Sequence, residues 1–335
     1  NSAGTLVLSF NSSATQALVN STLQQIGYTN SSDTPSASQT IAWAFNDGNS
    51  GSQGTGGAGS AGGTSTINIA VVNDAPAFSL LDGVAAYSEG GTAAVLDSNV
   101  TVLDAELAAS GNYAGATLTL NRSGGASAQD VFVATGTLGA LTQGTALIVG
   151  GTTIGSVTTN SAGTLLLTFN SSATQARVNS TLQQIGYTNS SDAPPASVTI
   201  AWSFNDGNSG TQGSGGPLSA SGTSTVNITA VNDAPVFSLL DGVAAYSEGG
   251  TAAVLDSNVT VLDAELAASG NYAGATLTLN RIGGANAQDG FAATGTLGAL
   301  TQGNALIVSA TTIGTVTTNS AGTLVLTFNS SATQA

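Results

Sequence analysis

The sequence predicts an all-β fold of tandem β-sandwich domains in a 159-residue repeat, each with one short helix. The segment that begins Asn1-Ser2-Ala3-Gly4 returns at Asn160 and again at Asn319, and the first two copies differ at 24 of 159 positions. A period of this length is that of a domain and not of a solenoid repeat. Short runs of alternating apolar and polar residues, separated by Gly, Asn, Asp and Ser, are typical of half-buried strands in a sandwich.

Four segments of the first copy carry the strand pattern. In the first of them, Leu6, Leu8 and Phe10 alternate with smaller or polar residues. Successive side chains on a strand point to opposite faces, so each such run would present one apolar face to a core. The four predicted strands are residues 5–10, 40–45, 66–71 and 117–120.

One segment predicts a helix, residues 13–26. Ser13 and Gln16 have the spacing of a capping box, and Gly27 stands where a glycine would end the helix. An apolar stripe follows at helical spacing, and its members are Val19, Leu23 and Ile26. In the second copy Arg177 replaces Leu18 while the stripe is kept, which indicates an exposed flank; the kept residues are Val178, Leu182 and Ile185.

The domain boundary is predicted from the linker Val72-Asn73-Asp74-Ala75-Pro76, which recurs as Val231-Asn232-Asp233-Ala234-Pro235. Proline stiffens such a junction because it fixes its own φ and favours an extended preceding residue. We therefore expect three parts: the end of one domain (1–74), a complete domain (75–233) and the start of the next (234–335). The chain begins and stops within a repeat, as a window through a longer array would. Residues 48–63 are rich in Gly and Ser and are expected to form a long flexible loop.

The composition restricts the chemistry. The chain contains no Cys, His, Met or Lys, so the usual zinc, haem, iron–sulfur and thiol sites lack their ligands. The 18 acidic residues and many amides and hydroxyls instead suit a hard cation such as Ca²⁺. The net charge of −15 argues against nucleic acid as a partner and against anionic membrane surfaces. No apolar run is long enough for membrane insertion of this segment.

Two interpretations of the acidic residues remain open. Asp104 and Glu106 are two positions apart, so on a strand, or at its end, both carboxylates could converge on one ion. Asn73, Asp74 and Glu89 lie in or near the linker and could add further oxygens. The alternative is that these residues are solvated turn residues that keep a weakly charged surface soluble. Asp47, in Asn46-Asp47-Gly48-Asn49, has the sequence of an ordinary turn, and turns or caps are also expected at Asp33, Asp82, Asp97 and Asp130.

The ordered set of motifs resembles a known family. The set comprises Asn73-Asp74-Ala75-Pro76, Tyr87-Ser88-Glu89-Gly90-Gly91, Val102-Leu103-Asp104-Ala105-Glu106, Ile26-Gly27-Tyr28-Thr29-Asn30 and Phe45-Asn46-Asp47-Gly48. It is similar to the cadherin-like tandem repeats, of the VNDAP type, found in giant bacterial surface proteins. The resemblance implies extracellular immunoglobulin-like or cadherin-like β-sandwiches, often stabilised by Ca²⁺, in adhesins and biofilm matrix proteins.

By the same resemblance, Ca²⁺ would bind at each interdomain junction. The implied ligands are Asn73, Asp74, Glu89, Asp104 and Glu106, repeated as Asn232, Asp233, Glu248, Asp263 and Glu265. This sequence departs from animal cadherins in its longer repeat and in a linker with fewer acidic residues.

Three functions follow from these observations. The leading hypothesis is a structural stalk of a surface adhesin or matrix protein, whose partners are the neighbouring repeats of the same array. The second is a self-assembling extracellular filament or sheath, in which residues 1–74 of one chain complete the half-domain that starts at residue 234 of another by strand exchange. The third, a glycosidase using Asp104 and Glu106, lacks any sign of the cleft that such enzymes need, so we expect no enzymatic activity.

Overall fold

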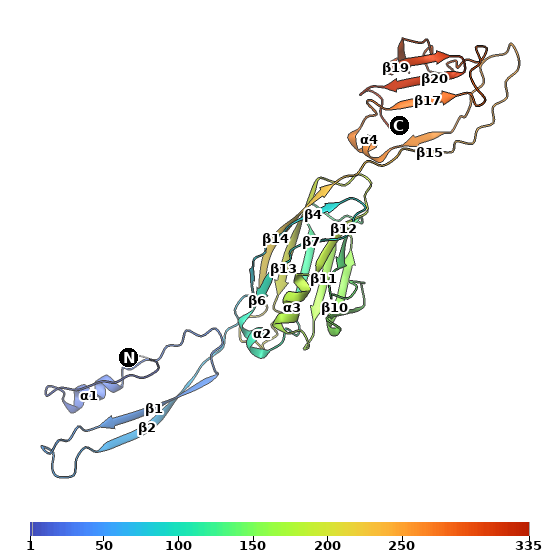
Figure 1. The fold of residues 1–335 in the computed structure, drawn as a ribbon. Coiled ribbons are helices and arrows are strands. Elements are labelled where there is room, and N and C mark those ends of the chain that lie inside the picture. Colours follow the sequence, from blue (N-terminus) through green and yellow to red (C-terminus); the bar gives the residue numbers. More distant parts are fainter. Residues whose placement is uncertain (2, 335) are drawn as a thin grey trace.

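The computed structural model describes residues 1 and 3–334 and shows an all-β protein with a few short helices. Its largest hydrophobic core lies within residues 75–233, here called the middle unit. The segments 1–74 and 234–334, here called the first and last half-units, lie at opposite ends of the middle unit (Figure 1). None of the helices in the described residues is long and apolar enough to cross a membrane.

The middle unit contains twelve strands and two helices. They are β3 (Ala77–Ser79), β4 (Val84–Ser88), β5 (Ala94–Val95), β6 (Thr101–Leu103), α2 (Ala105–Ser110), β7 (Thr117–Arg122), β8 (Asp130–Ala134), β9 (Ala146–Val149), β10 (Thr152–Ser161), β11 (Thr164–Phe169), α3 (Gln175–Leu182), β12 (Ile185–Asn189), β13 (Ser197–Asn205) and β14 (Ser219–Thr229).

These strands form a sandwich. One sheet has the order β4-β14-β13-β7-β11-β10-β9, a second has the order β5-β12-β8, and β3 pairs with β6. Side chains from all three sheets meet in one core, where Trp202 of β13 packs edge-on against Phe78 of β3 and Tyr187 of β12 packs edge-on against Tyr87 of β4. All neighbours in the large sheet are antiparallel except β4 and β14, which run parallel.

The alternation of apolar and polar residues explains why these segments form strands. Along β13 the residues Val198, Ile200, Trp202 and Phe204 are buried, and the residues between them face outward. The predicted strands 40–45 and 117–120 are confirmed as β1 (Ser38–Asn46) and β7. The predicted strand 66–71 is confirmed in part, because β2 spans Ser60–Asn68.

The predicted strand 5–10 depends on its neighbours. Its copies in the other units are strands β11 and β20, but residues 5–10 themselves form only a bridge at Thr5. In the middle unit β11 lies between β7 and β10, whereas among the described residues no strand is paired with residues 5–10. A strand without partners cannot satisfy its backbone hydrogen bonds in a sheet.

The helix prediction is correct in place but wrong at both ends. Helix α1 spans Gln16–Leu23, and Thr15, not Ser13, caps its N-terminus by accepting a hydrogen bond from the Leu18 N–H. The copy, α3, buries Val178 and Leu182 as predicted and leaves Arg177 half-exposed. Ile185 lies beyond the helix in β12, and Gly27 is not a cap. Its copy Gly186 is a close-packing site, since a Cβ there would lie 2.9 Å from Thr135 Cγ2.

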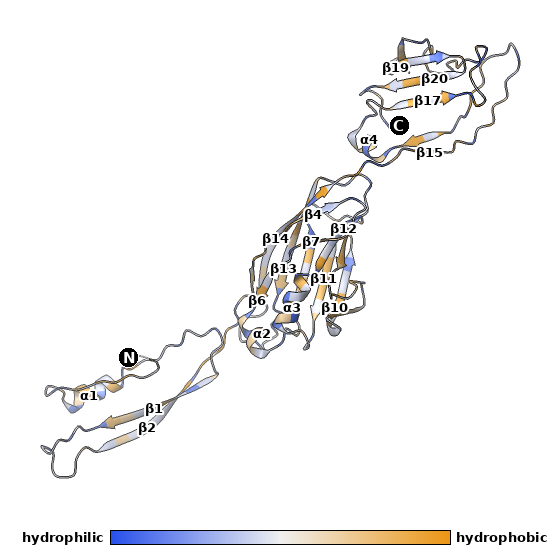
Figure 2. Ribbon diagram, viewed as in Figure 1, coloured by the Kyte–Doolittle hydropathy of each residue, from blue (hydrophilic) through white to orange (hydrophobic). Residues whose placement is uncertain are grey.

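The half-units contain parts of the same sandwich. The first contains α1, β1 and β2, and β1 pairs with β2 in the register that β13 and β14 use. The last contains β15 (Val236–Ser238), β16 (Thr260–Leu262), α4 (Ala264–Ser269), β17 (Thr276–Asn280), β18 (Ala305–Val308), β19 (Thr311–Ser320) and β20 (Thr323–Phe328). Figure 2 shows apolar residues along β17. The equivalent strand of the middle unit is β7, which pairs with β13 along one edge.

Candidate metal centre

At the first junction, where the linker enters the middle unit, strand β6 ends and helix α2 begins. Asp104 is the N-cap of α2: its Oδ1 accepts a hydrogen bond of 2.9 Å from the Leu107 N–H. The predicted strand-end position is therefore correct for Asp104, but Glu106 lies in the first turn of a helix that the sequence reading did not include. Both side chains are buried.

Burial leaves these two carboxylates without enough partners. Asp104 Oδ2 and both Glu106 oxygens have no hydrogen-bond partner. Burial raises the pKa of Asp104; the Leu107 N–H opposes this, and the nearby Asp206 and Asp74 charges raise that pKa further. Burial also raises the pKa of Glu106; the backbone N–H groups of Glu106 and Asp74 oppose this, and the charges of Asp104 and Asp74 raise that pKa further. Both shifts mean that the site resists negative charge until a cation compensates it.

A loop from the last part of the middle unit's sequence closes the same junction. The loop between β13 and β14 runs alongside the linker: the Asn73 N–H donates to Ser214 O (2.9 Å), and the Ser214 N–H donates to Val71 O (3.0 Å). Asn73 Nδ2 donates to Asp206 Oδ2 at 2.7 Å and to Gly216 O at 3.1 Å. Asn73 Oδ1 has no partner, although the side chain is buried.

Gln212 brings a further oxygen. Its Nε2 donates to Asp206 O at 3.1 Å, which leaves its Oε1 without a partner. Gln212 and Glu106 line one pocket of about 360 Å³, together with Thr34, Pro35 and Val71 of the first half-unit. The pocket therefore lies between the middle unit and the segment that precedes it.

The unpartnered atoms of the first junction are all oxygens. They are Asn73 Oδ1, Asp104 Oδ2, Glu106 Oε1, Glu106 Oε2 and Gln212 Oε1. Buried polar atoms are normally satisfied, and buried charges are normally paired. Among the described residues no carboxylate of this junction forms a salt bridge, since the ion pairs are Arg122–Asp130 and Arg281–Asp289. A set of carboxylate and amide oxygens fits Ca²⁺, which takes six to eight such ligands.

The second junction, between the middle unit and the last half-unit, gathers three acidic residues. Glu89 Oε2 accepts from the Val231 N–H at 2.8 Å, and Glu265 Oε1 accepts from the Asp233 N–H at 3.0 Å. One oxygen each of Glu89, Asp233 and Glu265 lies within 4.8 Å of the other two. Two ligands on one Ca²⁺, each 2.3–2.6 Å from it, are at most about 5 Å apart, so this spacing fits one ion.

The two junctions share their helix geometry. Asp263 caps α4 as Asp104 caps α2, with a hydrogen bond of 2.9 Å from the Leu266 N–H, and it is buried. Glu265 Oε2, like both Glu106 oxygens, is buried without a partner. The Asn232 amide is exposed and donates to Asp233 O.

The structure regroups the implied ligands. Glu89 does not join Asn73, Asp74, Asp104 and Glu106; it lies at the other end of the middle unit, with Asp233 and Glu265. Strand β4 explains this placement, because it runs parallel to β14 and ends beside Thr229, where the next linker begins. Glu248, the copy of Glu89, is exposed in the last half-unit and lies outside the Glu89, Asp233 and Glu265 group.

Two residues of the first junction were not among the implied ligands. Asp206 and Gln212 are copies of Asp47 and Gln53, and Asp47 was interpreted as a turn residue. Asp206 does shape a turn, because its Oδ1 accepts from the Asn208 N–H at 2.9 Å, but it is also fully buried against Asn73. The loop that carries it packs on the linker and is not free. The repeated Asn-Asp-Gly-Asn is the one sequence signal that marks it.

Comparisons with known proteins add little to this geometry. No protein-family model and no curated protein matches the chain. Solved structures similar to it include protocadherin gamma B2 extracellular cadherin domains 3–6 (14% identity, TM-score 0.29, covering 68% of this chain and 43% of that one) and human CDH23 EC21-23 (16%, 0.25, 61% and 48%). This chain thus spans less than half the length of these structures. Similarity at these TM-scores is too low to carry an argument about function.

Proposed function

We propose that this chain is part of an extracellular structural array, the stalk of a surface adhesin or biofilm matrix protein, in which Ca²⁺ at each junction holds neighbouring units in a fixed relation. The observation that carries the proposal is that five buried oxygen atoms of the first junction have no hydrogen-bond partner. These atoms belong to Asn73 of the linker, to Asp104 and Glu106 at the start of α2, and to Gln212 of the β13–β14 loop.

The two junctions together support the proposal, because each contains groups from a different neighbouring unit. At the first junction the following unit would contribute Asp104, Glu106 and the loop with Gln212, whose oxygens are buried without partners. At the second junction the preceding unit would contribute Glu89, which lies near Asp233 and Glu265. An ion at such a place would bind linker, preceding unit and following unit at once, which removes hinge freedom between the units.

The energetic gain at each junction is modest. Extracellular modules bind Ca²⁺ with dissociation constants of about 0.1–1 mM. At ten times such a constant, binding stabilises the occupied form by about 1.4 kcal/mol. A gain of this size at every junction is enough to shift a hinged chain towards an extended rod.

The test uses the full chain and the variant Glu106→Gln. In wild-type protein we expect Ca²⁺ to raise the melting temperature of the middle unit relative to a chelator, and to increase the maximum dimension measured by small-angle scattering. Glu106→Gln removes one buried charge without changing the shape of the side chain. We therefore expect it to stabilise the chelated protein and to weaken the Ca²⁺ response.

Asp82→Asn is the matched control, since the Asp82 carboxylate is exposed and is not among the oxygen atoms described at either junction. It should leave the Ca²⁺ response at the wild-type value. Equal melting temperatures with Ca²⁺ and with chelator in the wild-type protein would rule the proposal out.

A further inference from the structure

The β13–β14 loop at the first junction is held in shape by its own side chains. Asn208 is buried, and its Oδ1 accepts hydrogen bonds from the Gly210 N–H at 2.8 Å and from the Gln212 N–H at 3.1 Å. Its Nδ2 donates to Gly213 O at 3.1 Å. One buried amide thus fixes three backbone groups of a glycine-rich loop, so the loop has a defined surface to offer to its surroundings.

The base of the loop is fixed to the body of the middle unit. Asp206 follows β13 directly and is fully buried, and both of its carboxylate oxygens accept from the Leu218 N–H at 3.1 Å, across the loop. At Gly207 (φ +67°) a Cβ would lie 2.2 Å from Gly115 O, so two backbones touch where only glycine fits. The loop therefore moves with the middle unit.

Residues 71–73, here called the entry segment, pair with this loop as a short parallel bridge. Val72 and Ser214 are the bridge partners, and the two backbone hydrogen bonds to Ser214 come from the residues on either side of Val72. Asn73 Nδ2 adds a buried bond of 2.7 Å to Asp206 Oδ2. A hydrogen bond to a carboxylate is stronger than one between neutral groups, so the entry segment is attached through both its backbone and a side chain.

One glycine of the loop lies in close contact with the entry segment. At Gly213 (φ +117°) a Cβ would lie 2.9 Å from backbone atoms of Val71 and Val72, closer than real Cβ atoms approach. A larger residue at this position would push the loop away from the entry segment. Gly210 (φ +108°) belongs to the same loop, but the position of its Cβ has no atom within 4 Å. The contact with the entry segment therefore requires glycine at 213 and not at 210.

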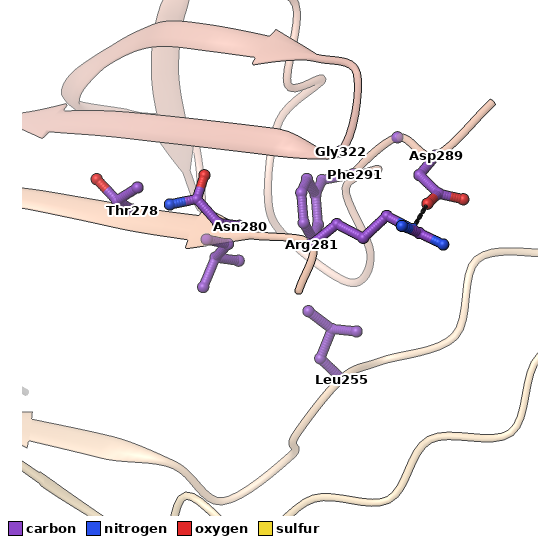
Figure 3. Close-up of a pocket in the computed structure, with 9 residues that line it drawn as sticks. Leu255, Thr278, Asn280, Arg281, Asp289, Phe291 and Gly322 are labelled. Carbon is purple, nitrogen blue, oxygen red and sulfur yellow. Dashed lines mark ion pairs between the residues drawn. The ribbon is translucent and has the colours of Figure 1, made fainter. Parts of the chain in front are cut away.

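The pocket at the first junction shows the same relation between loop and entry segment. Val71 lines this pocket together with residues 210–213 of the loop and with Glu106. Another cavity, of about 460 Å³, lies beside the Arg281–Asp289 ion pair in the last half-unit, and no residue of a linker lines it (Figure 3). The loop and the entry segment thus form adjoining walls of one pocket, which also contains a carboxylate of the candidate metal centre.

The preceding unit ends where the entry segment begins. In the middle unit, β14 stays in its sheet as far as Thr229. The copy of Thr229 is Ala70, and just before it the Ile69 N–H donates to Ala37 O of the preceding unit at 2.9 Å. Directly after it, Val71 O accepts a hydrogen bond from the loop of the following unit. Ala70 therefore stands alone between the last bond to one unit and the first bond to the next.

We propose that the β13–β14 loop is a clasp that holds the entry segment on the following unit whether or not an ion is bound, and that bending between units is confined to the backbone around Ala70. Every bond of the clasp joins a protein donor to a protein acceptor, so none of them requires Ca²⁺. The inference is independent of the proposed function. The clasp sets the direction in which the linker leaves the following unit, and an ion would act only on the freedom that remains.

Hydrogen exchange of single amides in the full chain, measured in chelator, tests the clasp. The Asn73 and Ser214 N–H groups bond across the contact and should be protected in the wild-type protein. Gly213→Ala should speed their exchange by about tenfold, the factor that corresponds to the loss of one hydrogen bond. Gly210→Ala is the matched control, because it adds the same methyl group at a similar positive φ but into open space, and it should change these rates much less. The amides of β13 report whether the middle unit stays folded.

An engineered disulfide tests the pairing itself, because the chain has no cysteine of its own. Neighbouring strands lie about 4.8 Å apart, which is within the range of Cα separations that a disulfide spans. The double variant Val72→Cys, Ser214→Cys should therefore cross-link within one chain under mild oxidation in chelator. The matched control is Val72→Cys, Ser209→Cys, since Ser209 lies on an exposed part of the same loop and is not a bridge partner.

Three outcomes would each overturn the clasp: unprotected Asn73 and Ser214 amides in wild-type protein with chelator, equal effects of the two alanine variants, or equal cross-linking of the two cysteine pairs. Protection that appears only after Ca²⁺ is added would also overturn it, while leaving the proposed role of Ca²⁺ in place. Protection in chelator without any response of the protein to Ca²⁺ would support the clasp and contradict the proposed function.

Discussion

In the proposed Ca²⁺ site, Asp104 and Glu106 would favour ion binding at the expense of the stability of the ion-free protein. Asp104 uses one oxygen to cap a helix, which fixes the direction of the other, and Glu106 is held two residues later by the same helix. Each is a poor core residue alone, because burial without a partner disfavours its charged form. A bound cation would offset that cost, because an opposite charge nearby favours the charged form of each carboxyl.

The raised pKa values predict a pH dependence that is opposite to ordinary acid denaturation. A carboxyl whose folded pKa exceeds its unfolded value adds stability that is fully present below the unfolded pKa and is lost as pH rises through the folded pKa. In chelator, the contribution of Glu106 should thus fall as pH rises from about 4.5, its ordinary value. The difference in melting temperature between Glu106→Gln and wild type should grow from pH 4.5 to pH 7. A constant difference would contradict the assignment.

Strand β13 and its copy β1 show how much one element depends on its neighbours. Both contain the sequence Ile-Ala-Trp, both pair with a following hairpin strand, and only β13 is covered on its other edge by β7. Burial, and with it the stabilising contribution of the apolar residues, is therefore a property of the unit and not of the strand.

A matched pair of substitutions measures this difference. Trp202→Ala should lower the free energy of unfolding of the middle unit by about 3–5 kcal/mol, as expected for a fully buried aromatic residue. Trp43→Ala should leave that transition unchanged, because Trp43 belongs to the first half-unit. Denaturant titration at low protein concentration checks both, and similar losses for the two variants would show that the half-unit is coupled to the middle unit.

The elements differ in how far the sequence predicts them. The strands β7 and β13 follow from alternation, because period two needs only the local sequence. Helix α2 was missed since six residues directly after a strand are too few to show a helical period. Gly27 suggested a helix end, yet its copy Gly186 is needed where β12 passes close to Thr135. That reason depends on tertiary packing and cannot be seen in the local sequence.

The candidate site was predictable in part for the same reason. Asn73 is next to Asp74, Asp104 is two positions from Glu106, and the structure brings the two pairs to one junction. Asp206 contacts Asn73 across 133 residues, and the parallel pairing of β4 with β14 sends Glu89 to the opposite end of the unit. Contacts of this kind depend on sheet order, which a single sequence does not reveal.

At the scale of the whole molecule, the small number of basic residues makes trypsin a simple probe of which parts of the chain are stably folded. The chain has three basic residues, all Arg: Arg122 and Arg177 lie in the middle unit, and Arg281 lies in the last half-unit. The Arg122–Asp130 pair is largely buried, while the equivalent Arg281–Asp289 pair is well exposed.

Limited trypsin digestion should therefore cut first after Arg281 and leave a stable fragment 1–281. Mass spectrometry of the early products identifies the site. First cleavage at Arg122 or Arg177 would show that the middle unit is less stable than its complete core implies.

The parallel pairing of β4 with β14 also constrains the time course of folding. Val84, near the start of the middle unit, pairs with Thr225, near its end, so the sheet cannot close until nearly all of the unit is available. Long-range pairing of this kind slows folding. Neighbouring units of nearly identical sequence compete for the same strands meanwhile, and a hairpin from one repeat can be captured by the next. In a chain released from one end, the order in which repeats emerge then decides which hairpin each sandwich receives.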